Sequence, residues 1–262
     1  MKAYERYLRE IKNFEGIEYL NLKKKKYMLN MINQYASICI LNKKDVPLQN
    51  QKKSETIMVD TKINNNGYDY VDFELPSGTL WATCNVGSNK PTDYGLYFQW
   101  GDTIGYTKEQ IGKDKQFNWN DYKFSIDGSN TNFSKYAEEG ETLELEDDAA
   151  HVNMGGSWHM PSHKQIMELI YNTTTEWTTL DEANGMKFSS KKDSSKFIFI
   201  PAAGYAWHGS FYNYGTNGFI WSSMSSKELI DSGQLLGIYL GGAYPGGLSS
   251  RYYGFSVRGV IG

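Results

Sequence analysis

The residues that most readily do chemistry are sparse in this chain. Only four histidines occur among its 262 residues. His159 and His163 are four residues apart, a spacing that on a helix would present two imidazoles to one zinc ion. However, Pro161 and a helix-capping Ser162 lie between them and place His159 before the helix. The sequence therefore disfavours a zinc site, and we expect no catalytic metal.

Adjacent carboxylates are the next candidates for catalysis. They occur at Asp147–Asp148 and at Glu138–Glu139. Neighbouring residues point to opposite sides of a strand, so neither pair forms the facing acids of a glycosidase. We interpret both pairs as surface charge, with Asp148 as a candidate ligand for a structural calcium ion.

Two sequence signatures that would indicate an enzyme are missing. The chain has no G-x-S-x-G, the turn that exposes the nucleophile of α/β-hydrolases. The stretch GGAYPGG, residues 241–247, is not followed by Lys-Ser or Lys-Thr and so does not match a phosphate-binding loop. We therefore expect a protein that is not an enzyme and uses no cofactor. A glycan-modifying enzyme with unrecognised carboxylates is the alternative from the enzyme class.

Charge divides the chain into two parts. Residues 1–53 hold 12 Lys and Arg against five Asp and Glu, a net of +7, which leaves −10 for the remainder. The Lys23–Lys26 cluster could contact nucleic acid but is more typical of a solvated helix face. The acidic remainder argues against a nucleic-acid partner. A mean hydropathy of −0.57 indicates no membrane insertion.

The cysteines and the N-terminus restrict the cellular compartment. Two cysteines, Cys39 and Cys84, are too few for a disulfide framework. The first 20 residues are charged throughout and do not resemble a secretory signal. Cys39 follows a basic start as in a lipoprotein signal, but Asn30, Asn33 and Gln34 make the intervening segment too polar. We expect no export by a signal peptide.

Hydrophobic spacing predicts three regions. Residues 1–41 show helical periodicity in two segments and are too few to form a core alone, so we expect them to attach to another protein or to copies of themselves. Residues 42–67 are polar and predict a linker, with a possible strand at Thr56–Asp60. The main domain spans residues 68–262.

Short elements are predicted within the main domain. Alternating apolar residues before and after a Pro-Ser-Gly turn predict a hairpin of Val71–Leu75 with Leu80–Cys84. Ser162 and Gln165 form an S-x-x-Q capping box at the start of a helix. We expect strands at Phe197–Ile200 and Phe255–Val260 to pair with each other. Four tryptophans flanked by small or apolar residues are expected in the core: Trp81, Trp100, Trp158 and Trp221.

Seven motifs in a fixed order carry a family resemblance. They are LPSGTLWATCNVG, DYGLYFQWGDT, FNWNDYKF, LEDDAAHVNMGGSWHMPS, FIPAAGY, GFIWSS and RYYGFSVR. Together they resemble the major paralogous domain of Fibrobacter succinogenes, over residues 70–262. The chain departs from that family at His159, where an Arg usually follows the Trp of GGSW, so a contact that depends on that Arg is in doubt.

The resemblance implies a fold and a class of function. It implies an α+β, C-type-lectin-like domain rich in short strands and loops, here preceded by an N-terminal helical segment. Similar domains in Bacteroidetes and their phages serve as ligand-binding tips of fibres and as variable proteins of diversity-generating retroelements. Formylglycine-generating enzymes share the fold but work through cysteines. Cys84 is this domain's single cysteine and lies in its first hairpin, which argues against that activity.

Two aromatic segments are the expected ligand-binding loops. The stretch Trp207–Tyr214 is bounded by glycines, and Tyr244–Tyr252 lies where similar domains carry their ligand-facing residues. Exposed aromatic rings suit contact with sugars or proteins. The predicted ligand-binding residues are Trp207, His208, Tyr212, Tyr214, Tyr244, Leu248, Ser249, Ser250 and Tyr252.

The expected function is adhesion. We expect a phage virion protein of the head or tail fibre that binds a host surface glycan or protein, forms a homo-oligomer, and contacts other virion proteins through residues 1–60. A ligand-binding domain without a signal peptide fits a virion that leaves the cell by lysis. The alternative is a cytoplasmic or surface interaction module of a Bacteroidetes cell.

Overall fold

The computed structural model describes residues 62–63 and 66–262, which fall within the unit Gln51–Gly262. The helices expected within residues 1–41, the strand expected at Thr56–Asp60, and Cys39 lie outside the described residues. The described part consists mainly of strands, with the α-helices α3 (Ala149–Met154) and α4 (His163–Asn172). This composition agrees with the predicted α+β class, whereas the lectin-like fold stays a prediction.

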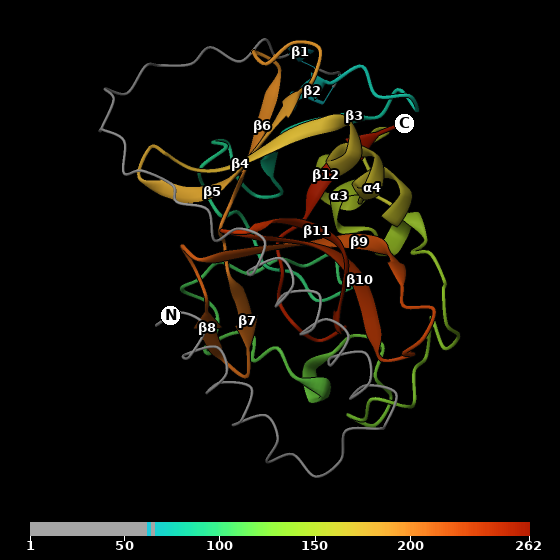
Figure 1. Ribbon diagram of the computed structural model, residues 1–262. Helices are drawn as coiled ribbons and strands as arrows, with labels where there is room; N and C mark the ends of the chain where they lie inside the picture. Colours follow the sequence, from blue (N-terminus) through green and yellow to red (C-terminus); the bar gives the residue numbers. More distant parts are fainter. Residues whose placement is uncertain (1–61, 64–65) are drawn as a thin grey trace. The chain divides into compact units, whose positions relative to one another are not determined.

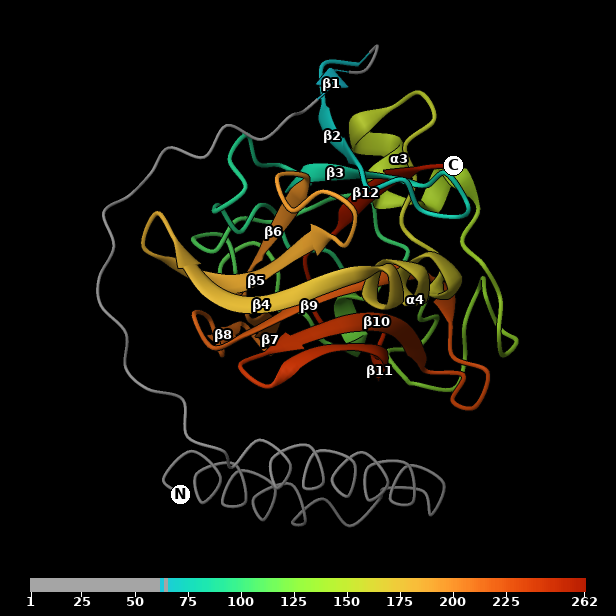
Figure 2. The ribbon, with the colours of Figure 1, turned by 45° about the horizontal axis from the view of Figure 1, so that its top comes forward.

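The described strands form four antiparallel sheets (Figures 1 and 2). The first two have the orders β1-β2-β3-β12 and β4-β5-β6, with β1 (Lys62–Ile63), β2 (Asp69–Asp72), β3 (Leu80–Asn85), β12 (Arg258–Ile261), β4 (Thr173–Leu180), β5 (Ala183–Ser190) and β6 (Phe197–Pro201). The other two have the orders β11-β10-β9 and β7-β8, with β9 (Asn217–Ser225), β10 (Ser232–Tyr239), β11 (Gly242–Ser250), β7 (Tyr205–Trp207) and β8 (Ser210–Tyr212). Two short 3₁₀ helices are η1 (Trp119–Asp121) and η2 (Leu145–Asp147).

The predicted capped helix is confirmed, and so is the first hairpin, although β2 ends at Asp72 and not at the predicted Leu75. Strands β2 and β3 pair antiparallel with Val71 opposite Trp81. At the start of α4 the N–H of Gln165 donates to Ser162 Oγ over 3.3 Å, and the N–H of Ser162 donates to Gln165 Oε1 over 2.9 Å. Local capping chemistry was sufficient to locate this helix. Among the described residues, no helix combines the length and apolarity needed to cross a membrane.

The expected pairing of the two C-terminal strands is wrong. Strand β6 pairs with β5, which is its neighbour in sequence, and β12 pairs with β3. The reason is the long hairpin β4–β5, whose eight-residue strands are joined by Asp181 and Glu182 with φ of 43° and 68°. The two-residue turn pairs β4 with β5, and β6, which follows β5 in sequence, then pairs with the free edge of β5 without a chain crossing.

The C-terminal segment Arg251–Ile261 runs through the middle of the domain. Its backbone bonds to three other segments, through Trp100 N to Arg251 O at 2.9 Å, Phe98 N to Phe255 O at 2.9 Å, Trp221 N to Ser256 O at 3.1 Å and Val86 N to Val257 O at 2.9 Å. The four tryptophans expected in the core are at most 1% exposed, which confirms that prediction. The core is therefore assembled around this C-terminal segment.

Arg258 at the start of β12 is fully buried. Its guanidinium donates Nε to Asn85 Oδ1 at 2.9 Å, Nη1 to the Ala82 carbonyl at 3.0 Å and Nη2 to the Phe199 carbonyl at 3.0 Å. These acceptors lie on β3 and β6, so one side chain ties two sheets together. Burial lowers the pKa of Arg258 to about 10, because the charged form loses its hydration.

We predict that Arg258→Lys lowers the free energy of unfolding by ~2–4 kcal/mol, because an ammonium on a shorter stem leaves buried carbonyl oxygens without donors. Urea denaturation measures this change. Lys113→Met, at an exposed position, is the control and should change stability by less than ~0.5 kcal/mol. Equal stability of Arg258→Lys and the wild type would show that the guanidinium does not hold the sheets together.

Candidate ligand-binding surface

The segment expected as an aromatic loop is a hairpin. Strands β7 and β8 pair with Trp207 opposite Ser210. The two turn residues, His208 and Gly209, have φ of 46° and 70°, the left-handed geometry that fits the twist of tight hairpins. The prediction of a loop here is wrong, because Gly209 forms the tight turn of a hairpin and does not mark an irregular loop.

The hairpin presents different rings on its two faces. Tyr205 lies opposite Tyr212, and Trp207 shares their face because side chains alternate along a strand. Ala206 and Phe211 point the other way. The rings of Tyr205 and Tyr212 stack with centroids 5.4 Å apart.

Further aromatic residues from distant segments join the first face. The Trp207 ring lies parallel to Tyr253 at 6.1 Å, and its Nε1 donates to the Tyr252 hydroxyl over 2.9 Å. Trp119 packs on Tyr252 with centroids 4.8 Å apart. We define the aromatic surface as the exposed or half-buried residues Trp119, Tyr205, Trp207, His208, Tyr212 and Tyr253. It is a set of ring edges and faces positioned by three parts of the chain.

Tyr252 supports this surface from below. Only 9% of the residue is exposed, so its prediction as a ligand-facing residue is wrong. Burial raises the pKa of Tyr252, and the hydrogen bond from Trp207 acts in the opposite direction. Tyr252 and Tyr253 lie in a turn after β11, in which the N–H of Tyr253 donates to the Ser250 carbonyl over 3.1 Å. Their rings pack with centroids 4.9 Å apart, and Tyr253 is the more exposed of the two.

Tyr214 belongs to the reverse face of the hairpin. It is 54% exposed, but its ring stacks on Phe211 at 5.5 Å. The ammonium of Lys108 lies 4.2 Å from the Tyr214 ring centroid, a cation–π contact that covers the ring. Phe211 in turn packs edge-on against the buried Tyr97. The structure therefore separates Tyr214 from Trp207, His208 and Tyr212.

The second expected loop is mostly a strand. Tyr244, Leu248, Ser249 and Ser250 lie in β11, which pairs with β10 along its length, apart from a bulge. Pro245 is tolerated because β11 is an edge strand and the bulge interrupts the ladder there. These four residues are half-buried and are not part of the aromatic surface. The expectation of a loop is wrong because glycines that indicate a turn also occur at strand bulges.

Asp147 and Asp148 are buried, at 3% and 2% exposure, so their interpretation as surface charge is wrong. Asp148 caps α3 by accepting the N–H of His151 over 2.9 Å, and it accepts the N–H of Met160 over 2.8 Å. Burial raises the pKa of Asp148 although these donors oppose the shift. Its carboxylate oxygens accept hydrogen bonds from backbone N–H groups. A calcium ion bound at Asp148 stays a prediction. Glu138 and Glu139 are exposed as expected.

An ammonium occupies the centre of the acidic cluster around Asp147. Within the described residues, Glu144, Glu146 and Asp147 are the one set of three potential ligands close enough to hold a metal ion. Lys135 Nζ lies 2.5 Å from Glu144 Oε2, 2.8 Å from Glu146 Oε1 and 2.5 Å from Asp147 Oδ2. Burial opposes ionisation of Asp147, but Lys123, Lys135 and the Tyr136 hydroxyl outweigh it and lower its pKa.

The two histidines considered for zinc lie in different elements. His159 pairs with Val260 in an isolated bridge before the helix, and His163 is the first residue of α4. His159 Nε2 is 3.1 Å from the Gly262 carbonyl oxygen. Burial lowers the pKa of His163. Their positions agree with the expectation that the pair does not share a helical turn.

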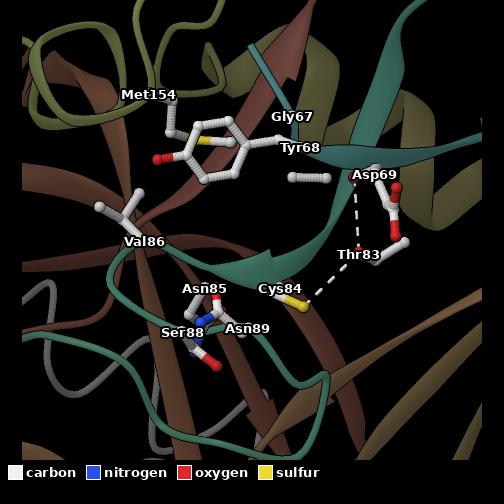
Figure 3. Close-up of a pocket in the computed structure, with 11 residues that line it drawn as sticks. Gly67, Tyr68, Asp69, Thr83, Cys84, Asn85, Val86, Ser88, Asn89 and Met154 are labelled. Carbon is white, nitrogen blue, oxygen red and sulfur yellow. Dashed lines mark hydrogen bonds between the residues drawn. The ribbon is translucent and has the colours of Figure 1, made fainter. Parts of the chain in front are cut away.

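A hollow of about 210 Å³ lies beside β2 and β3 (Figure 3). Polar groups of Asp69, Thr83 and Asn89 line it together with Cys84 and Met154. None of its lining residues belongs to the aromatic surface. The Cys84 thiol is 3.5 Å from Thr83 Oγ1, and the structure gives it no catalytic partner among the lining residues.

The chain matches no family model, no curated protein and no solved structure. The candidate site therefore rests on the geometry above. Sequence reasoning missed Trp119, Tyr205 and Tyr253. Tyr253 follows the predicted Tyr252, but the two lie in a turn, where strand alternation does not indicate which of them is exposed. Trp119 and Tyr205 carry no local signal, since only tertiary packing brings them to this surface.

We predict that Tyr252→Ala lowers the free energy of unfolding by ~3 kcal/mol, since it removes a buried ring and leaves Trp207 Nε1 without its acceptor. Tyr214→Ala, on the reverse face, should cost less than ~1 kcal/mol. Urea denaturation of both variants tests the assignment. Equal losses would mean that Tyr252 is not the support of the surface.

We predict acid sensitivity from Asp147. Its pKa is lowered in the folded protein, so its contribution to stability is complete above the unfolded value of about 4 and is lost as pH falls through the folded value. Asp147→Asn should be less stable at pH 7 and lose less stability between about pH 5 and pH 2. Denaturation at several pH values measures the slopes. Asp114→Asn, an exposed control, should keep the wild-type slope, and a wild-type slope in Asp147→Asn would refute the prediction.

Proposed function

We propose that the protein is a ligand-binding module whose aromatic surface stacks on the sugar rings of a cell-surface glycan. The observation that carries this proposal is the gathering of half-exposed rings from β7, β8, η1 and Tyr253 over the buried Tyr252. Flat rings bind the apolar faces of sugars, and a hydrogen-bonded support keeps them in place. A protein ligand would meet the same rings and is the competing outcome.

Two charged side chains near the surface, Asp231 and Lys115, are buried, which favours an uncharged glycan. Asp231, whose charge acts on the Tyr252 hydroxyl, is buried and accepts hydrogen bonds from Asn130 Nδ2 and Ser232 Oγ, each at 2.9 Å. The Lys115 ammonium is buried and donates to the Asp121 carbonyl over 2.7 Å. Among these described neighbours, charged groups are thus turned inward, and rings and the His208 imidazole face outward.

The place of this module on a phage fibre rests on the sequence resemblance alone. Under that proposal, residues 1–60 attach the domain to the virion or to copies of itself, and the ligand is a glycan of the host cell. A cellular interaction module would use the same surface. Mass spectrometry of purified virions distinguishes these two locations by the presence of the chain.

Binding should depend on the first face of the hairpin. We predict that Trp207→Ala and Tyr212→Ala each weaken binding by ~1–2 kcal/mol, or roughly 5–30-fold, because each removes one stacking contact. Tyr214→Ala is the matched control on the reverse face and should bind like the wild type. The measurement is binding to an array of neutral and acidic oligosaccharides, followed by calorimetric titration of the neutral hexasaccharide that binds most tightly.

The outcomes separate the candidates. Loss of binding in Tyr214→Ala but not in Trp207→Ala would place the site on the wrong face. Wild-type protein that binds no oligosaccharide but binds host cells, in a manner abolished by protease treatment of those cells, would identify a protein ligand instead. Turnover of an oligosaccharide would favour the enzyme alternative.

A further inference from the structure

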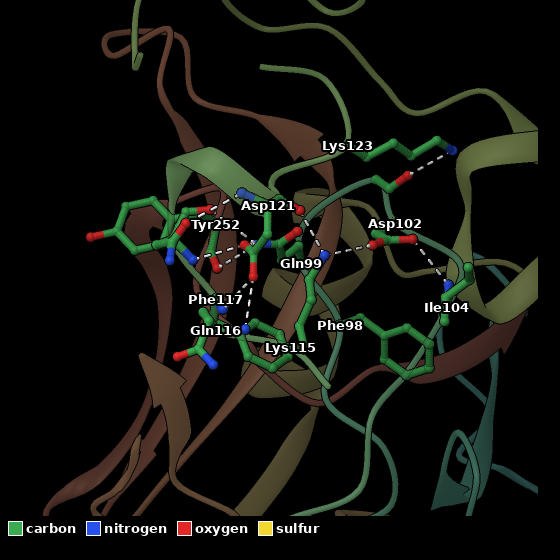
Figure 4. A network of polar contacts seen from close by, with 12 residues as sticks. Phe98, Gln99, Asp102, Ile104, Lys115, Gln116, Phe117, Asp121, Lys123 and Tyr252 are labelled. Carbon is green, nitrogen blue, oxygen red and sulfur yellow. Dashed lines mark hydrogen bonds and ion pairs between the residues drawn. The ribbon is translucent and has the colours of Figure 1, made fainter. Parts of the chain in front are cut away.

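Asp121, the last residue of η1, holds an unusual set of donors (Figure 4). Its Oδ2 accepts the backbone N–H of Gln116 over 2.8 Å and that of Phe117 over 2.9 Å. Its Oδ1 accepts the N–H of Asn118 over 2.9 Å and Gln99 Nε2 over 2.8 Å. Three successive backbone N–H groups therefore converge on one carboxylate.

This convergence requires a backbone conformation that a bulky residue seldom adopts. Phe117 has φ of 55°, in the left-handed region, although it is fully buried and not a glycine. Successive N–H groups in such a turn form a concave anion site, which here receives the carboxylate of Asp121. The carboxylate compensates for the strain at Phe117.

The loop held by Asp121 anchors the tip of the β7–β8 hairpin. The carbonyl of Phe117 accepts the N–H of His208 over 3.2 Å, and the carbonyl of Gln116 accepts the N–H of Gly209 over 2.6 Å. Gly209 has φ of 70°, which side-chain-bearing residues rarely adopt, and a Cβ there would lie 3.2 Å from the backbone of Gly112. The position of Trp207 and His208 thus depends on the loop.

The same carboxylate also positions Trp119, a part of the aromatic surface that does not come from the hairpin. Asp121 and Asn118 form the capping box of η1, whose first residue, Trp119, packs on Tyr252. Gln99 Nε2, which donates to Asp121, also donates to the Tyr252 carbonyl over 3.1 Å. Trp119, the hairpin tip and Tyr252 therefore all connect to one side chain.

We propose that Asp121 is the positioning residue of the aromatic surface, which it holds in its binding shape before the glycan arrives. This inference rests on the proposed function and deepens it. A surface that is ordered in advance binds more tightly, because fewer side chains have to be immobilised on binding. Asp121 itself does not contact the glycan, since its two oxygens already accept four hydrogen bonds from within the domain.

The test compares Asp121→Asn with Asp147→Asn, because Asp147 is another carboxylate with several donors, and these are Lys123, Lys135 and Tyr136. An amide NH₂ cannot accept from backbone N–H groups, so Asp121→Asn should loosen the tip. We expect amide hydrogen exchange at His208 and Gly209 to become at least about tenfold faster in Asp121→Asn. Affinity for the neutral hexasaccharide identified on the array should fall about tenfold. In Asp147→Asn, compared at equal global stability, both should stay at the wild-type value.

The two readouts keep this inference separate from the proposed function. Exchange and affinity that match those of Asp147→Asn would overturn the role of Asp121. Faster exchange at the tip, with a Trp207→Ala variant that binds the hexasaccharide normally, would retain the positioning role and refute the binding surface. If Asp121→Asn does not fold, Gln99→Met removes one donor to Asp121 and the bond to Tyr252, and it should give a smaller change in the same direction. Unchanged exchange in Gln99→Met would then overturn the inference.

Discussion

Arg258 carries a positive charge into the interior, and the arrangement of the sheets follows from its need for oxygen acceptors. A buried guanidinium without hydration is costly unless each N–H finds a partner. Asn85, Ala82 and Phe199 provide those partners from β3 and β6. The segment that leads into Arg258 must therefore pass between these sheets, and this passage fixes where Tyr252 and Tyr253 emerge.

Arg251, at the other end of the same segment, is also buried, but its guanidinium is stabilised by different contacts. Its guanidinium carbon lies 4.8 Å from the Trp100 ring centroid and 5.1 Å from that of Phe133, and Nη1 donates to the Tyr136 carbonyl over 2.7 Å. Burial lowers the pKa of Arg251. The two arginines hold the segment at both ends, through carbonyl oxygens in one case and mainly through ring faces in the other. Tyr253 of the aromatic surface, and its support Tyr252, lie between these two fixed points.

The sequence predicted what local chemistry determines. The first hairpin, the capping box of Ser162 and Gln165, and the burial of four tryptophans required only neighbouring residues or size. The pairing of β6 depends on the β4–β5 hairpin, and the burial of Asp147 depends on its ion pair with Lys135. Both are tertiary contacts, which local sequence patterns do not indicate. Of the residues on the aromatic surface, Trp207, His208 and Tyr212 were among those predicted to bind a ligand, whereas Tyr252, also predicted, is buried beneath them. The strand β11 was mistaken for a loop because its glycines serve a bulge.

The anchoring of the hairpin tip has a consequence for how this surface changes over time. Main-chain atoms of His208 and Gly209 make the anchoring bonds, and their partners are main-chain carbonyls. The side chains of His208 and Ser210 therefore take no part in these anchoring bonds, whereas Gly209 is restricted by its φ of 70°. Under the proposed binding function, substitutions at those two outward positions alter what the surface recognises without altering the path of the chain, so selection can change the ligand while the architecture stays constant.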